Sequence, residues 1–257
     1  MSDLFGQTES GIPPEPVFSL FSGGKDSFAT AKFLSERKLL LGCILIDTGV
    51  SVPGWRESCV ELCRQHDWRY EVIPTTYRYE WFVWKYGFPG PGMHGEVMTY
   101  LKGRAIREYR KVHREALASG VREQESGRRT LSTKPLSQWE EVPIYAPIFE
   151  WSTADTWAYA KAAGYERPEA YSKLNISGDC LCGAFAEPHE RQAIKVHYPA
   201  FDAKLCQLEI QCPKGAPYNQ WGHGQGKPKP MDANQAALCF DCGRIPLTPR
   251  PVGEACE

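Results

Sequence analysis

Hydrophobic and polar positions along the first third of the chain predict alternating strands and helices. Apolar runs at residues 17–21, 39–46 and 69–75 have the length of buried strands and are separated by polar turns. After the second run, apolar residues recur at helical spacing, as at Trp55, Cys59 and Leu62. Strands separated by helices predict right-handed crossovers, and therefore an α/β fold with a parallel sheet covered by helices on both faces.

The turn between the first strand and its helix has the composition of a phosphate-binding loop. It reads Ser22-Gly23-Gly24-Lys25-Asp26-Ser27. Glycines let an anion approach the main chain, the start of the helix offers unpaired N–H groups, and the lysine and the two serines add a charge and hydroxyl donors. The spacing excludes a Walker A loop, which needs four residues between its first glycine and its Gly-Lys pair.

A second polar turn follows the second predicted strand. Ligands of parallel sheets bind outside the carboxyl ends of the strands, so Asp47, Thr48 and Gly49 are expected on the same edge of the sheet as the loop. Asp26 is a candidate to help hold a hydrated Mg²⁺, because this metal favours a carboxylate together with phosphate oxygens. Capping of the helix is the alternative role for Asp26.

The next segment is aromatic and then basic. Pro and Gly at residues 89–92 predict that residues 77–93 form a covering loop, followed by a basic helix over about residues 95–117 on which Arg107 faces solvent. Beyond it, Arg122, Glu125, Ser126 and Arg129 crowd one short stretch. Arginine can grip phosphate oxygens with two hydrogen bonds, and Glu125 can hold an arginine or a ribose hydroxyl. A later helix is expected to begin at Ser152 or Thr153.

Composition narrows the class of protein. The 257 residues are 42% hydrophobic with a net charge of −1, which predicts a globular chain without a general attraction to nucleic acid or membrane. We expect a cytoplasmic protein, because the start has no apolar signal region and no apolar run reaches about 18 residues. The 10 cysteines are then expected to be reduced, with Cys43, Cys59 and Cys63 as buried thiols.

Two close cysteine pairs indicate a metal centre. Cys180 and Cys182 are separated by one residue, Cys239 and Cys242 by two, and a glycine follows each pair. Four soft sulfur ligands are typical of Zn²⁺ or an iron–sulfur cluster, and the spacing does not choose between them. Cys206 or Cys212 replacing one ligand, and four unrelated buried thiols, are the alternatives.

Five segments in this order resemble the PAPS reductase-like branch of the N-type ATP pyrophosphatases: SGGKDS, DTG, MHGEVMTYLKGR, GVREQESGRR and APIFEWSTADTWAYA, over roughly residues 17–190. The resemblance implies an adenine nucleotide α-hydrolase-like fold and ATP cleaved between its α- and β-phosphates to adenylate a substrate, often for sulfur insertion. It also implies catalytic roles for Lys25, Asp26, Arg122 and Arg129. Iron–sulfur relatives favour a 4Fe–4S cluster over Zn²⁺.

The resemblance leaves the partners and one alternative activity open. The sulfur acceptor is a nucleic acid or a small metabolite, and a sulfur-donor protein is a further candidate partner. Sulfonucleotide reductases resemble the same fold but carry a degenerate loop, and Cys256 lacks their Glu-Cys-Gly-x-His surroundings. A nucleotide-binding module with a structural metal site is the non-enzymatic alternative. We divide the chain into an N-terminal segment (1–16), a nucleotide-binding domain (17–175) and a cysteine-bearing region (176–257).

Overall fold

A computed structural model describes residues 11–123, 134–139 and 142–224 of the chain. Its six-stranded sheet has the order β3-β2-β1-β4-β6-β5. The strands are β1 (Val17–Leu20), β2 (Leu40–Asp47), β3 (Tyr70–Pro74), β4 (Leu117–Ala118), β5 (Leu136–Trp139) and β6 (Val142–Tyr145). All neighbouring strands pair in parallel except β5 and β6, which pair antiparallel.

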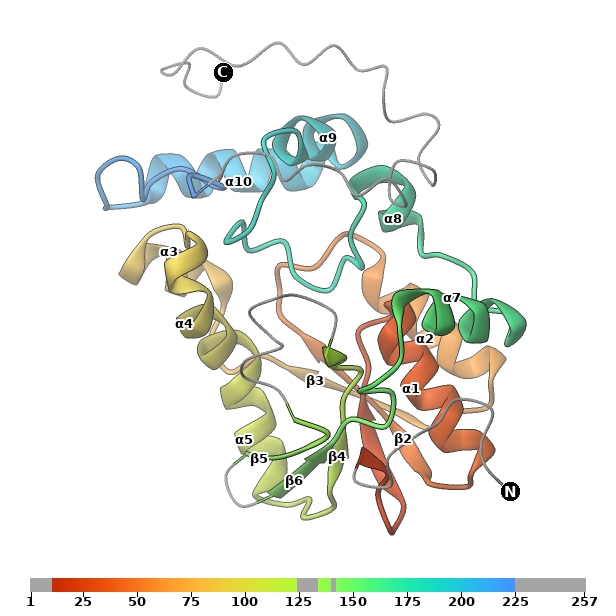
Figure 1. Ribbon diagram of the computed structural model, residues 1–257. Helices are drawn as coiled ribbons and strands as arrows, with labels where there is room; N and C mark the ends of the chain where they lie inside the picture. Colours follow the sequence, from red (N-terminus) through yellow and green to blue (C-terminus); the bar gives the residue numbers. More distant parts are fainter. Residues whose placement is uncertain (1–10, 124–133, 140–141, 225–257) are drawn as a thin grey trace. The chain divides into compact units, whose positions relative to one another are not determined.

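Helices cover both faces of this sheet, as Figure 1 shows, with α1, α2 and α7 on one face and α5 on the other. Their bounds are α1 (Lys25–Glu36), α2 (Trp55–Gln65), α5 (Arg104–Arg110), α7 (Thr153–Ala162) and α8 (Glu169–Leu174). Each strand contributes side chains to the packing on both faces of the sheet, because its successive side chains point to opposite faces. Phe18 packs with Ile106 of α5, while its neighbour Val17 packs with Leu34 of α1. The predicted α/β class is confirmed.

Two local predictions need correction, and one element was not predicted. Residues 77–93 contain a helix, α3 (Tyr79–Tyr86), whose residues Tyr79, Phe82 and Val83 are buried at helical spacing. The basic helix ends at Arg110, seven residues before its predicted end, and Leu117 belongs to β4. The β5–β6 hairpin was not predicted. Solvent exposure of Arg107 and burial of Cys43, Cys59 and Cys63 are confirmed. The expectation that all cysteines are reduced is wrong at Cys206, whose sulfur is disulfide-bonded.

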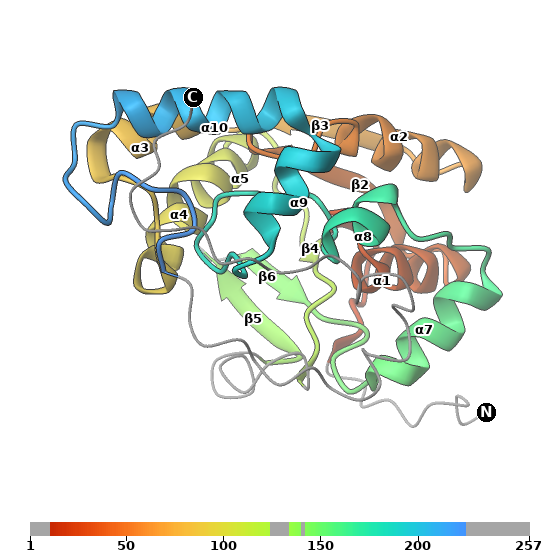
Figure 2. The same cartoon turned by 90° about the horizontal axis from the view of Figure 1, so that it is seen from above.

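The chain divides into two compact units, residues 1–79 with 98–181, and residues 80–97 with 182–257. The first unit carries the sheet. The second contains α3, the short helices η2 (Pro91–Met93) and α4 (His94–Met98), and the consecutive helices α9 (Glu190–His197) and α10 (Pro199–Gln211), which Figure 2 shows next to each other. Arg191 of α9 joins these two helices by ion pairs to Asp202 and Glu209. No helix in the described parts of the chain is long and apolar enough to cross a membrane.

Candidate functional site

The loop after β1 takes a conformation that needs its first glycine. Gly23 has a φ of +76°, in the left-handed region, and a Cβ at this position would lie 2.6 Å from the Sγ atom of Cys59. The loop therefore lies directly on α2. Gly24 then serves as the N-cap of α1, without any side-chain hydrogen bond to the first turn of the helix.

Side chains behind the loop hold its carbonyl groups. The indole N–H of Trp55 donates to the carbonyl of Ser22, and the hydroxyl of Tyr165 donates to that of Gly23, each at 2.8 Å. Within the loop, the Ser27 hydroxyl donates to the Gly24 carbonyl at 2.9 Å and accepts from the Ser22 amide at 3.2 Å. With its carbonyls engaged and no side-chain cap, the first turn of α1 keeps the donors that an anion would need.

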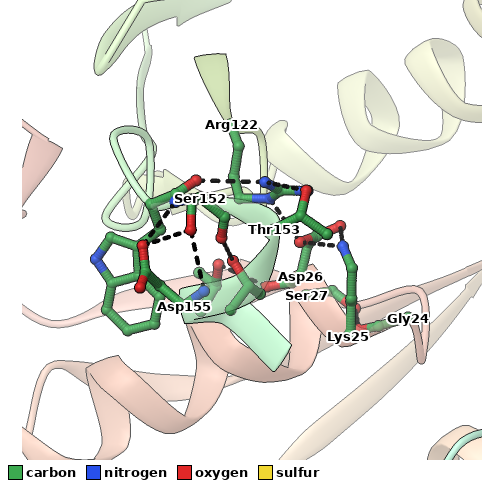
Figure 3. Close-up of polar contacts among 11 residues, drawn as sticks. Gly24, Lys25, Asp26, Ser27, Arg122, Ser152, Thr153 and Asp155 are labelled. Atoms are coloured by element: carbon green, nitrogen blue, oxygen red, sulfur yellow. Dashed lines mark hydrogen bonds and ion pairs between the residues drawn. The ribbon is translucent and has the colours of Figure 1, made fainter. Parts of the chain in front are cut away.

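Asp26 lies between two cations (Figure 3). Its Oδ1 atom accepts from Arg122 Nε at 2.7 Å, and the Nζ atom of Lys25 lies 2.7 Å from both of its oxygens. The Arg122 guanidinium also donates to the carbonyl of Trp151 and to the hydroxyl of Thr153. The residue is only 2% exposed, so in this arrangement Arg122 positions the Asp26 carboxylate at the loop.

This pairing changes the roles considered for Asp26. The partners of its carboxylate are Lys25 and Arg122 and not the main-chain amides at the start of α1, so this arrangement does not support the capping role. Both carboxylate oxygens already face cationic nitrogen atoms, so the carboxylate is not arranged here as a ligand for a metal. Mg²⁺ stays a prediction that depends on the nucleotide. Lys25 is only 9% exposed, so it is more buried than a side chain on a solvent-exposed edge of the sheet would be.

Gly120, two residues after the end of β4, comes unusually close to the start of α1. A Cβ on Gly120 would lie 2.7 Å from the carbonyl carbon of Asp26 and 2.8 Å from the amide nitrogen of Ser27. Only a glycine allows this approach of the two main chains. The contact brings the segment of Arg122 to the phosphate-binding loop, although the two are almost 100 residues apart in the sequence.

A cavity of about 600 Å³ opens beside the loop, within the first unit. One wall is polar and is formed by the loop and by the segment from α8 onward; it includes Ser22, Gly24, Asp26, Ser27, Tyr171 and Ser177. A second part of the lining is apolar and comes from β1, β2 and α5; it includes Leu20, Ile44, Ile46 and Ile106. A ligand with an anionic end and a flat apolar end fits this division, because each end meets a wall of its own polarity.

The cavity contains an ion pair that sequence reasoning did not single out. Lys102 pairs with Asp179, which also accepts a hydrogen bond from the Ser177 hydroxyl at 3.0 Å. Burial alone would raise the pKa of the Asp179 carboxyl, but the Lys102 ammonium outweighs it and holds the pKa below its ordinary value. Lys102 belongs to η3 (Thr99–Gly103), a π-helical turn, and such turns are frequent at functional sites.

The predicted turn after β2 holds the segment of Asp179. The hydroxyls of Thr48 and Ser51 both donate to the carbonyl of Asp179 at 3.1 Å. The amide of Gly49 donates to the side chain of Asp47 at 3.0 Å. Ile46, the residue before Asp47, lines the cavity. This turn therefore supports the cavity through Asp179, a residue that the sequence pattern of Asp47 to Gly49 did not indicate.

The predicted metal ligands are only partly described. Cys180 follows Asp179 directly and is half-buried, and Cys182 is buried; neither is in a disulfide, and a thiol is the donor type that a cluster or Zn²⁺ takes. Cys239 and Cys242 lie outside the described residues, as do Glu125, Ser126 and Arg129. Within the described ranges, no group of three or more His, Cys, Asp or Glu side chains could hold a metal ion.

The Ser27 hydroxyl gives a first prediction. Ser27→Ala removes its bonds to Ser22 and Gly24, and we expect unfolding free energy to fall by about 1–2 kcal/mol and nucleotide affinity by about tenfold. Ser35→Ala, in the last turn of the same helix, is the matched control. Urea denaturation and calorimetric titration check both quantities. Equal effects of the two substitutions would contradict a special role of Ser27.

Three solved structures are similar to this chain at low sequence identity. The solved structure of phosphoadenylyl-sulfate (PAPS) reductase from Candida auris in a phosphate complex is 15% identical, covering 60% of this chain and 75% of that chain, with a TM-score of 0.45. The U34-tRNA thiolase NcsA from Methanococcus maripaludis with its 4Fe–4S cluster is 15% identical, covering 77% and 71%, with a TM-score of 0.44. NMN synthetase from Francisella tularensis is 14% identical, covering 85% and 91%, with a TM-score of 0.49.

Comparison by sequence matches a family model. No curated protein matches the chain. The family model described as phosphoadenosine phosphosulfate reductase domain matches residues 16–177, which is more than half of the chain. The matched range begins just before β1 and ends at Ser177 in the polar wall of the cavity, so it includes the phosphate-binding loop and most of the side chains described above.

Proposed function

We propose, from the premise that this chain belongs to the phosphoadenosine phosphosulfate reductase domain family, that it binds ATP and cleaves it between the α- and β-phosphates. The cleavage adenylates a substrate, and the adenylate serves sulfur transfer. An acceptor oxygen forms a bond to the α-phosphorus, the bond to the bridging oxygen breaks, and pyrophosphate leaves. The acceptor is a nucleic acid or a small metabolite.

One observation supports this proposal most: the complete loop, with an uncapped helix start, lines a cavity whose other lining residues include an apolar group from β1, β2 and α5. Pyrophosphate gains negative charge as it leaves, and the N–H groups of α1 together with Lys25 would stabilise that charge without rearranging. The apolar wall around Ile44 and Ile106 suits an adenine ring. Lys102 lines the cavity, where it pairs with Asp179, and would add a second positive charge near the α-phosphate.

Mg²⁺ and a cysteine-bound centre complete the proposal. Mg²⁺ would enter with the nucleotide and neutralise phosphate charge. The thiols of Cys180 and Cys182 would hold part of a 4Fe–4S cluster, or Zn²⁺ as the alternative, with Cys239 and Cys242 as the remaining ligands. A cluster would supply a site for a sulfur atom near the segment of Asp179.

Nucleotide binding tests the proposal directly. We expect the wild-type protein with Mg²⁺ to bind α,β-methylene-ATP, and Lys25→Ala to weaken this binding about tenfold to a hundredfold, because a charge-assisted contact of roughly 1.5–3 kcal/mol is lost. Arg107→Ala, on the exposed side of α5, should leave it unchanged. Calorimetric titration measures both. Lack of binding by the wild-type protein would refute an ATP-using enzyme.

The sulfonucleotide reductase alternative makes a different product. A reductase would release sulfite from PAPS or adenylylsulfate in the presence of a dithiol, whereas the proposed enzyme would release pyrophosphate from ATP once its acceptor is supplied. Sulfite formation without any binding of the ATP analogue would favour the reductase. A purely nucleotide-sensing module would bind the analogue and form neither product.

A further inference from the structure

A cation on an aromatic surface lies outside the cavity wall, close to the phosphate-binding loop. The Arg167 guanidinium stacks on the indole of Trp157, with its central carbon 4.2 Å from the ring centre. The ammonium of Lys25 lies 5.9 Å from the centre of the same ring. One indole of α7 thus holds two positive charges beside the start of α1.

Arg167 belongs to a segment, residues 165–171, that contacts the phosphate-binding loop. Tyr165, two residues before Arg167, donates its hydroxyl to the carbonyl of Gly23 and packs its ring 6.1 Å from Trp157. Arg167 and Asp26 both influence the Tyr165 hydroxyl electrostatically. Further along, the Tyr171 hydroxyl lies 3.7 Å from where a Cβ of Gly24 would be. Residues 165–171 therefore follow the outer side of the loop.

The charge of Arg167 is not neutralised by an acidic neighbour. Its side chain is exposed, and among the residues that the structure describes it makes no ion pair. Glu169, the acidic residue two positions later, pairs instead with Lys173 at 2.7 Å. A guanidinium that is fixed by stacking and carries an unneutralised charge is ready to accept an anion, since little side-chain freedom remains to be lost on binding.

We propose that Arg167, held in place by Trp157, is a specificity-determining residue that binds the pyrophosphate end of the nucleotide together with Lys25. This inference rests on the proposed function and adds the residues that distinguish ATP from nucleotides without a pyrophosphate group. A triphosphate whose α-phosphate is in the cavity extends along the loop to the two cations. A nucleoside monophosphate, or a sulfonucleotide without a pyrophosphate group, does not reach Arg167, so the residue favours ATP.

Binding of three probes to matched variants tests this inference. We expect Arg167→Gln to weaken α,β-methylene-ATP and inorganic pyrophosphate about tenfold, while AMP binding changes by less than about twofold. Arg167→Lys should recover part of the loss because it keeps the charge. Trp157→Leu should lower the same two affinities by about threefold to fivefold, since the guanidinium is then no longer fixed. Melting temperatures of all variants identify any loss through unfolding.

Arg37→Gln is the matched control. Arg37 stacks on Phe33 at the other end of α1, 3.5 Å from the ring centre, and should affect none of the three probes. Wild-type protein that binds no ATP analogue would overturn the proposed function and this inference together. Wild-type binding with an unchanged ratio of ATP-analogue to AMP affinity in Arg167→Gln would overturn the inference alone. So would a variant that loses only single-stranded oligonucleotide binding, because Arg167 would then serve a nucleic acid.

Discussion

Asp26→Ala is expected to remove nucleotide binding and to destabilise the protein at the same time. The substitution leaves the charges of Lys25 and Arg122 facing each other without the carboxylate that lies between them. The Arg122 side chain is only 3% exposed, so water cannot replace the lost partner. Removing one partner of a buried ion pair costs about 3–5 kcal/mol, and the 22% exposure of Asp26 places the expected loss near the lower end, at about 3 kcal/mol.

Two measurements check this expectation. The free energy of unfolding from urea denaturation should fall by about 3 kcal/mol, and the melting temperature by roughly 6–12 °C for a chain of this size. Affinity for α,β-methylene-ATP should fall by more than about a hundredfold, because two repelling cations would no longer keep the loop in place. A folded Asp26→Ala protein of unchanged stability would contradict the positioning role of Arg122.

Two controls separate burial from charge. Glu108→Ala removes the partner of Lys111 in an exposed pair and should cost less than about 1 kcal/mol. The double variant Asp26→Ala/Arg122→Met removes both buried charges and should regain much of the stability without regaining nucleotide binding. Recovery of binding in the double variant would show that neither charge serves the nucleotide.

The sequence predicted the elements whose signals are local. Strand β1, the loop and α1 follow one another within twenty residues, so apolar periodicity, two glycines and one lysine are enough to define them. The N-cap of α7 was likewise predictable: Ser152 and Asp155 form a reciprocal capping box three residues apart. These predictions depend on neighbours in the chain and not on how distant segments pack.

The contacts that complete the site are not local. Arg122 was interpreted as a phosphate ligand, yet it lies buried against Asp26, 96 positions earlier in the chain. Lys102 and Asp179 are 77 positions apart, and the Asp179 carbonyl is held by hydrogen bonds from Thr48 and Ser51, which are 131 and 128 positions away. A residue pattern gives the chemistry of such side chains, but their partners are set by the packing of the sheet. Helix α3 was missed for another reason. The Pro and Gly residues at 89–92 predict a loop across residues 77–93, but they lie after the end of α3 and do not interrupt it.

The four predicted metal ligands should lose their metal as a group. If Cys180, Cys182, Cys239 and Cys242 bind one centre, each single Ser substitution removes a thiolate and should lower metal affinity by at least about tenfold, with all four variants sharing one phenotype. Iron, acid-labile sulfide and zinc are measured on protein purified without oxygen. Iron together with sulfide identifies a cluster, and zinc alone identifies the structural alternative.

Cysteines with other contacts provide the controls for this prediction. Cys43 is fully buried and hydrogen-bonded to Cys63, so Cys43→Ser should keep full metal content and show at most a packing defect. The Cys212 thiol lies 3.7 Å from the carbonyls of Val83 and Tyr218, and Cys212→Ser should also keep the metal. Loss of metal from Cys212→Ser or Cys206→Ser, with retention in one of the four, would show a different ligand set. Because Cys180 adjoins Asp179 of the cavity wall, metal-free protein should also transfer sulfur more slowly; transfer at the full rate would make the centre purely structural.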